Sequence, residues 1–146
     1  MTIELDERRR TKGAGFALGA GLVLQLAAIA AVVQASGAIE QHLREVYEPY
    51  KPGQVDQAGS LVVTYLLTLG ALGVVGWLVT AWAHRRGLRW TRPLAVTLLV
   101  LGTVLAVTNL VVTEYGSRLI PAWPGAAGLL PSLAGVVAVV MLFRER

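Results

Sequence analysis

Residues 13–39, GAGFALGAGLVLQLAAIAAVVQASGAI, contain no charged residue. A membrane-spanning α-helix needs about 20 predominantly apolar residues, because each residue advances the helix by about 1.5 Å through a hydrocarbon core of about 30 Å. Three further stretches are equally free of Asp, Glu, Lys and Arg, namely residues 57–83, 93–113 and 119–143. The four stretches together predict an all-α fold, a transmembrane four-helix bundle.

The overall composition agrees with a protein that lies mainly in lipid. Of 146 residues, 55% are hydrophobic and 15% are charged, whereas a soluble domain carries about a quarter charged residues. We expect a single membrane domain with helices at about 13–48, 57–84, 92–113 and 125–143. The first stretch exceeds the roughly 7–15 apolar residues of a signal peptide, so it is expected to remain as an anchor.

The basic residues are concentrated on alternate sides of the expected helices. Because positively charged loops stay in the cytoplasm, this distribution predicts that both termini are cytoplasmic. It also explains the positive net charge without nucleic-acid binding. Binding of anionic lipid headgroups is the alternative interpretation, and topology alone is the simpler one. Ten of the thirteen Lys and Arg residues belong to the expected cytoplasmic side: Arg8, Arg9, Arg10, Lys12, Arg85, Arg86, Arg89, Arg92, Arg144 and Arg146.

The first helix is expected to extend beyond the membrane on the outer side. An apolar stripe at helical spacing follows the last small residues of the first stretch, formed by Ile39, Leu43, Val46 and Tyr47. Pro49 disfavours helical backbone at the residue before it, so the extension is expected to end there.

Local signals place the other helix ends. Asp56 is the expected N-cap of the second helix, and Thr91 is the expected N-cap of the third. Gly87 is expected to end the second helix. Residues 120–125 contain two prolines and are expected to be irregular, while Pro131 is expected to bend the fourth helix.

Polar residues within the spans are the candidates for a binding site, because polar groups are costly in lipid. With the predicted orientation, several of them fall in the outer leaflet, where they would line a pocket open to the outside with Trp77 as its floor. Hydrogen bonding between helices is the simpler interpretation, and Gln25 near the middle of the first helix is a further candidate for it. The candidate ligand-binding residues are Gln34, Thr64, Tyr65, Thr68, Asn109 and Glu114.

The sequence contains no pattern that indicates a catalytic site. No Asp, Glu, Lys, Arg or His lies deep in a span, and the chain has no cysteine. The two histidines, His42 and His84, are predicted on opposite sides of the membrane, so no shared metal site is expected. No phosphate-binding loop or nucleophile motif is present. We expect no catalytic residues, no metal and no cofactor.

Small residues are frequent, and Gly15 and Gly19 form a GxxxG pattern in the first helix. Such spacing lets helices approach closely in lipid. Packing within one chain is the favoured interpretation, and a homodimer interface is the alternative.

The stretch 65–143 resembles a class of small bacterial four-helix integral membrane proteins that has no established activity. The resemblance rests on Gly-Trp-Leu at 76–78, Arg-Trp at 89–90, Thr-Asn-Leu at 108–110 and Gly-Leu-Leu-Pro-Ser-Leu-Ala-Gly at 128–135. It implies a bacterial inner (plasma) membrane and no particular reaction.

The biological role is therefore not defined by any motif. We expect a non-enzymatic accessory or interaction subunit, with the lipid bilayer and a homodimer or membrane protein as partners. One alternative is a small transporter, or a lipid- or small-molecule-binding protein with an outward-facing polar pocket. Another is a holin-like pore former.

Overall fold

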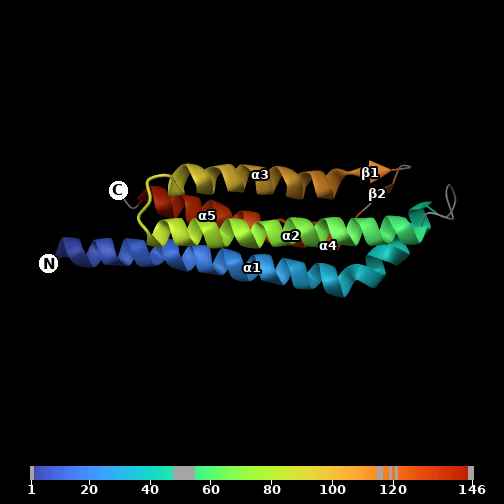
Figure 1. The fold of residues 1–146 in the computed structure, drawn as a ribbon, viewed down its shortest axis with the longest axis horizontal. Coiled ribbons are helices and arrows are strands. Elements are labelled where there is room, and N and C mark those ends of the chain that lie inside the picture. Colours follow the sequence, from blue (N-terminus) through green and yellow to red (C-terminus); the bar gives the residue numbers. More distant parts are fainter. Residues whose placement is uncertain (1, 48–54, 115–116, 119, 121, 145–146) are drawn as a thin grey trace.

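The structure is a computed structural model, which describes residues 2–47, 55–114, 117–118, 120 and 122–144. Helices dominate these residues and lie side by side along one long axis (Figure 1). The all-α prediction is therefore confirmed. The elements are α1 (Thr2–Tyr47), α2 (Val55–Arg85), α3 (Thr91–Val111), β1 (Thr113–Glu114), β2 (Ser117–Arg118), α4 (Ala122–Ala127) and α5 (Leu130–Arg144).

Three helices are long and apolar enough to cross a membrane by length and composition. These candidate spans are Lys12–Glu45 within α1, Gln57–Arg85 within α2, and Thr91–Val111, which is all of α3. α5 is also apolar but has only 15 residues. Helices with apolar residues on every side are typical of a membrane protein, since a soluble bundle would expose a polar face.

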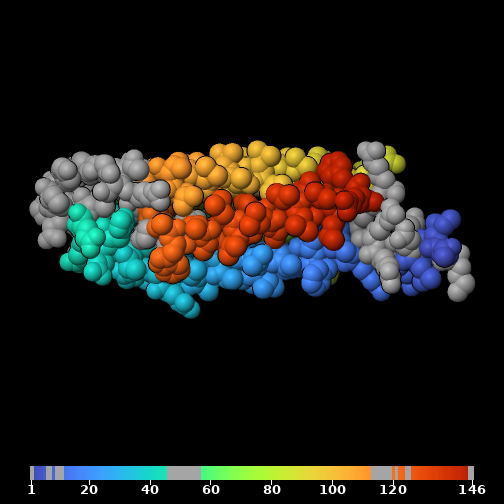
Figure 2. Space-filling model, turned by 180° about the vertical axis from the view of Figure 1, so that it is seen from behind, coloured from blue at the N-terminus to red at the C-terminus, as the bar shows by residue number. Residues whose placement is uncertain are grey.

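The start of α1 and the end of α5 lie at the same end of the bundle. Figure 1 shows the start of α1, the α2–α3 turn and the end of α5 together at one end. The end of α1, the start of α2, the β1–β2 pair and α4 lie at the other. Viewed from behind, α5 runs between α1 and α3 (Figure 2).

α1 is longer than expected at its start and forms the predicted extension at its end. The helix begins at Thr2, and the charged residues before Gly13 continue it rather than precede it. Near its C-terminal end α1 bends towards α2 (Figure 1), where Ser36 Oγ donates to the carbonyl oxygen of Val33 at 2.9 Å beside Gly37. Such back-bonding and Gly/Ser pairs are known causes of helix bends.

The bend places the apolar stripe of the extension against α2. Ile39 and Leu43 are fully buried, and Val62, Val63 and Leu66 of α2 pack on them. The extension is therefore part of the bundle rather than a free helix. Val46 and Tyr47, the other residues of the predicted stripe, have no described side chains.

The single fourth helix of the prediction is wrong, because two helices occupy its range. α4 begins at Ala122 and includes Pro124, and residues 128–129 then form a turn before α5. Proline is tolerated in the first helical turn, where no N–H is required. For the same reason Pro131 does not bend a helix but stands in the first turn of α5, where it is buried.

The α2–α3 turn is closed by Gly87, as predicted. Gly87 has a positive φ of 63°, the N–H of Leu88 donates to Ala83 and the N–H of Gly87 donates to His84, which is a Schellman motif. The N-cap prediction for Thr91 is wrong, because Trp90 is the cap residue. Thr91 Oγ1 instead donates backwards to the carbonyl of Leu88 at 2.8 Å.

Two further predicted boundaries differ in detail. Asp56 is the second residue of α2, which begins at Val55, so it lies inside the first turn and is not the N-cap. The expected loop after the third helix contains the short antiparallel pair β1–β2, in which Glu114 lies opposite Ser117.

Candidate ligand cavity

A cavity of about 310 Å³ lies among α1, α2, α3 and α5. This volume falls at the lower end of the roughly 300–1,000 Å³ typical of small-molecule sites. The lining is mainly apolar, and none of the residues that form it is charged. They are Leu18, Gln25, Leu69, Leu72, Gly73, Gly76, Trp77, Thr80, Ala95, Leu98, Leu99, Leu101, Gly102, Leu105, Gly128, Pro131, Ser132, Gly135, Ala138 and Val139.

Trp77 forms one wall because glycines leave room for its indole ring. A Cβ atom at Gly21 of α1 would overlap the ring, and a Cβ at Gly135 of α5 would lie 4.0 Å from its Cη2 atom. Ala17, Leu18 and Ala138 make a buried cluster between α1 and α5, and Trp77 packs against it. The ring, which belongs to α2, is thereby held against both α1 and α5.

Gln25 connects α1 to α2 at the cavity wall. Its Nε2 atom donates to the carbonyl oxygen of Gly70 at 3.2 Å. The amide occupies space that Gly73 leaves open, since a Cβ at Gly73 would stand 2.7 Å from Gln25 Cδ. Among the described residues, Gln25 makes no other hydrogen bond, so its Oε1 atom remains available as an acceptor.

The hydroxyl groups of the spans differ in their availability. Thr80 Oγ1 donates to the carbonyl of Gly76 in its own helix at 2.8 Å, although Thr80 lines the cavity. Thr68, Thr97 and Thr108 bond their own helices in the same way. Ser132 also lines the cavity, and within the described part of the chain its hydroxyl has no hydrogen-bond partner. Gln25 and Ser132 therefore offer the polar groups of this site.

A second, smaller cavity of about 140 Å³ lies nearer the end of the bundle where α1 ends and α2 begins. Gln25, Gly73 and Gly102 line both cavities, whereas Asn109 lines only the smaller one. Gln25 therefore marks the boundary between a larger apolar space and a smaller one that reaches Asn109.

Of the five predicted site residues whose side chains the structure describes, Tyr65 and Asn109 are the pair that it joins across two helices. The hydroxyl of Tyr65 donates to Oδ1 of Asn109 at 3.2 Å, which links α2 to α3. Thr64 is exposed, and its carbonyl accepts the bond from Thr68. Gln34 is exposed on α1, and Glu114 lies in β1, where its side chain falls outside the described set. Their role in ligand binding stays a prediction.

The residues that form the larger cavity were not singled out as a site from the sequence. Gln25 was expected to be a hydrogen-bonding residue between helices, and the bond to Gly70 has that form. Trp77 was expected at the floor of a pocket, and it does line the cavity. Ser132 carried no distinctive signal, because a serine in an apolar helix usually bonds its own backbone.

Comparison with protein-family models, with curated proteins and with solved structures finds no match to this chain. The cavity itself is therefore the feature from which a function can be inferred. An uncharged, mainly apolar lining suits a neutral apolar molecule that carries a single hydrogen-bonding group, since Gln25 offers one amide oxygen and Ser132 one hydroxyl, while the Thr80 hydroxyl donates to its own helix.

Proposed function

We propose that the chain is a bacterial inner-membrane protein with four spans and both termini in the cytoplasm. In this arrangement α4 and α5 together make the fourth span, because α5 alone has 15 residues and reaches only about 22 Å. The basic residues support the orientation. The α2–α3 turn, whose sequence contains Arg85, Arg86 and Arg89, lies at the same end of the bundle as the start of α1 and the end of α5 (Figure 1).

Within that arrangement we propose that the protein binds a neutral apolar small molecule or lipid chain in the larger cavity. The observation that carries the proposal is the apolar space of about 310 Å³ into which Gln25 and Ser132 can offer polar atoms. The space is partly open at its sides, and an apolar occupant would gain van der Waals contacts with its apolar walls. A hydroxyl or carbonyl on that occupant can bond Gln25 Oε1 or Ser132 Oγ.

Tryptophan fluorescence tests the proposal directly. A variant that keeps Trp77 alone (Trp82→Phe, Trp90→Phe and Trp123→Phe) is purified in detergent and titrated with ω-bromoundecanol, an apolar alcohol whose bromine quenches indole. Specific binding should quench Trp77 saturably. A second variant that keeps Trp123 alone is the control, because Trp123 is 53% exposed on α4 and does not line the cavity. Its quenching should rise without saturation as the alcohol partitions into the micelle.

A cavity-filling substitution then separates binding from partitioning. No atom lies within 4 Å of a Cβ built at Gly102, which lines the cavity, or at Gly19, which does not. Gly102→Leu should abolish the saturable quenching, and the matched Gly19→Leu should leave it unchanged. Quenching of Trp77 that never saturates, or that persists in Gly102→Leu, rules out the proposed site.

An interaction subunit is the second candidate, and the surface of α1 supports it. Gly15 and Gly19 are exposed, and a Cβ at either position would meet no atom within 4 Å. This GxxxG pair therefore does not serve packing against the described part of the same chain. If it joins two copies, Gly15→Leu with Gly19→Leu should convert a dimer into a monomer in light scattering of the detergent-solubilised protein. A wild-type monomer at all concentrations excludes the homodimer.

A further inference from the structure

The α2–α3 turn concentrates positive charge and aromatic surface at one end of the bundle. Arg85, Arg86, Arg89 and Arg92 fall within one short segment, and no acidic residue occurs between residues 57 and 113. Trp82 and Trp90 flank the turn and are 50% and 44% exposed. Positive charge alone would be enough to keep the turn on the cytoplasmic side. The side chains of this turn are in addition arranged by specific contacts with one another and with α5.

The backbone of the turn brings the two indole rings together. The positive φ of Gly87 reverses the chain, and the Leu88 N–H donates to the carbonyl of Ala83 at 3.1 Å. As a result the ring centroids of Trp82 and Trp90 lie 6.5 Å apart with 51° between their planes. The two residues, eight positions apart in sequence, thus form one aromatic surface.

Two arginines are positioned by neighbouring groups. The guanidinium carbon of Arg86 lies 5.5 Å from the centre of the Trp82 ring, a cation–π geometry. Arg92 Nε donates to the carbonyl of Leu142 at 2.9 Å, and its guanidinium carbon lies 5.9 Å from the centre of the Phe143 ring. Arg92 therefore joins α3 to α5. The side chains of Arg85, Arg86 and Arg89 are exposed. Among the described residues, the N-cap residue of α3, Trp90, makes no side-chain capping hydrogen bond.

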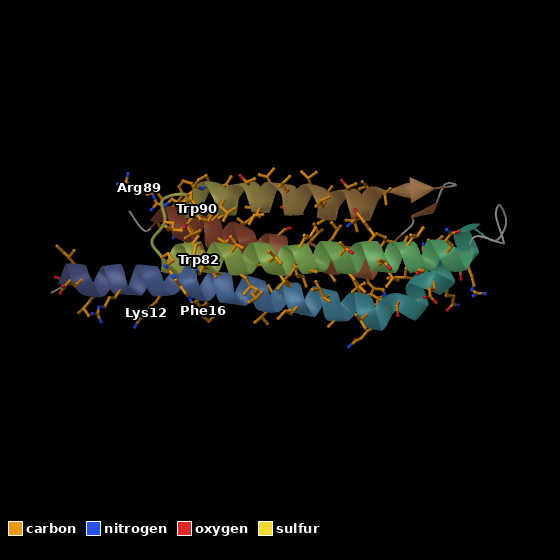
Figure 3. The ribbon with its side chains drawn as sticks, viewed as in Figure 1. Lys12, Phe16, Trp82, Arg89 and Trp90 are labelled. Carbon is orange, nitrogen blue, oxygen red and sulfur yellow. The ribbon has the colours of Figure 1, made fainter. Side chains whose placement is uncertain are left out.

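The same end of the molecule carries an aromatic and basic pair on α1. Figure 3 shows Lys12 and Phe16 near the same end of the bundle as Trp82, Trp90 and Arg89. Phe16 is 79% exposed. Exposed aromatic rings beside basic side chains are typical of a helix at the level of lipid headgroups. This placement favours an occupant that has a phosphate group and apolar chains.

We propose that the α2–α3 turn binds the headgroup of an anionic phospholipid, such as phosphatidylglycerol. The guanidinium groups of Arg86 and Arg89 bind the phosphate, and the Trp82–Trp90 surface contacts the glycerol and the upper acyl chains. Guanidinium groups suit this role because they donate two parallel hydrogen bonds to phosphate oxygens. A soluble phosphate would use the arginines alone and leave the aromatic surface without a function.

Native mass spectrometry of the full chain in detergent provides the test. The protein is titrated with phosphatidylglycerol or phosphatidylcholine of the same acyl chains. The wild type should retain phosphatidylglycerol, and the Arg86→Gln/Arg89→Gln variant should bind it at least about tenfold more weakly. The matched control, Arg8→Gln/Arg9→Gln, removes the same charge at the same end and should stay within about twofold of the wild type.

A charge-preserving variant keeps the test valid if the glutamine variant fails to fold. Arg86→Lys/Arg89→Lys retains topology and charge, and should weaken phosphatidylglycerol binding about threefold, since an ammonium group makes no two-point contact. Unchanged binding in this variant overturns the proposal. Equal losses in the glutamine variant and its control, equal retention of phosphatidylcholine by the wild type, or complete displacement by inorganic phosphate also overturn it.

Discussion

The indole ring of Trp77 on α2 fills the space that Gly21 on α1 leaves open. A Cβ atom at Gly21 would overlap the six-membered part of the ring, and no other glycine among those described has so close a neighbour. Because Trp77 also lines the larger cavity, this contact fixes both the approach of α1 to α2 and the shape of the space behind the ring.

Gly21→Ala should therefore destabilise the bundle. The added methyl group must push the ring of Trp77 aside, and overpacking of this kind costs about 1–3 kcal/mol. Gly19→Ala is the matched control, because a Cβ at Gly19 meets nothing within 4 Å and alanine favours the helix. Thermal unfolding in one detergent measures both. A Gly21→Ala protein at least as stable as Gly19→Ala would contradict the contact.

Gln25→Leu should remove the hydrogen bond between α1 and α2. The bond from Nε2 to the Gly70 carbonyl is the kind that contributes about 0.6–2 kcal/mol between membrane helices. Gln34→Leu should have little effect, because Gln34 is exposed and shows no hydrogen bond to a described residue. Reversible unfolding in mixed micelles compares the two, and equal losses would show that Gln25 is not specifically bonded.

The Tyr65–Asn109 bond should appear as an energetic coupling between α2 and α3. A double-mutant cycle of Tyr65→Phe and Asn109→Ala should give about 0.5–1.5 kcal/mol. The control cycle pairs Thr68→Val with Asn109→Ala. It should give no coupling, because the Thr68 hydroxyl donates to Thr64 in its own helix. Coupling of the same size in both cycles would argue against a specific pair.

Labelling of single cysteines tests the four spans and their direction. The chain has no cysteine, so each substitution introduces one thiol. In intact cells a membrane-impermeant maleimide should label Gln41→Cys and Ala122→Cys. Thr2→Cys and Arg144→Cys should react only after permeabilisation. Labelling of Arg144→Cys but not of Thr2→Cys in intact cells would mean that α4 and α5 do not cross the membrane, and labelling of both would mean that the orientation is reversed.

The sequence was most informative where a helix had to be apolar along its whole length. The charge-free stretches located α1, α2 and α3, and Gly87 marked the end of α2 because its positive φ suits glycine. Prolines were misleading in the fourth stretch. Pro124 and Pro131 each stand near the start of a short helix. The residue type alone does not show whether a proline begins a helix or bends one.

The cavity could not be predicted because its walls depend on which helix faces meet. Helices in lipid carry apolar residues on all sides, so periodicity does not identify the face that turns inward. Gln25, Gly102 and Ser132 come from three different helices and share no local pattern. Tyr65 and Asn109 were predicted to share a pocket, and the structure joins them by a hydrogen bond while placing Gln34 on an exposed face.

The length of α1 has a mechanical consequence. Its 46 residues extend about 69 Å, more than twice the roughly 30 Å of a hydrocarbon core. One continuous helix thus runs from the charged start at Thr2, through the bend at Ser36, to the segment where Ile39 and Leu43 pack against α2. Because Ile39 and Leu43 are fully buried there, the end of α1 cannot shift without disturbing its contact with α2.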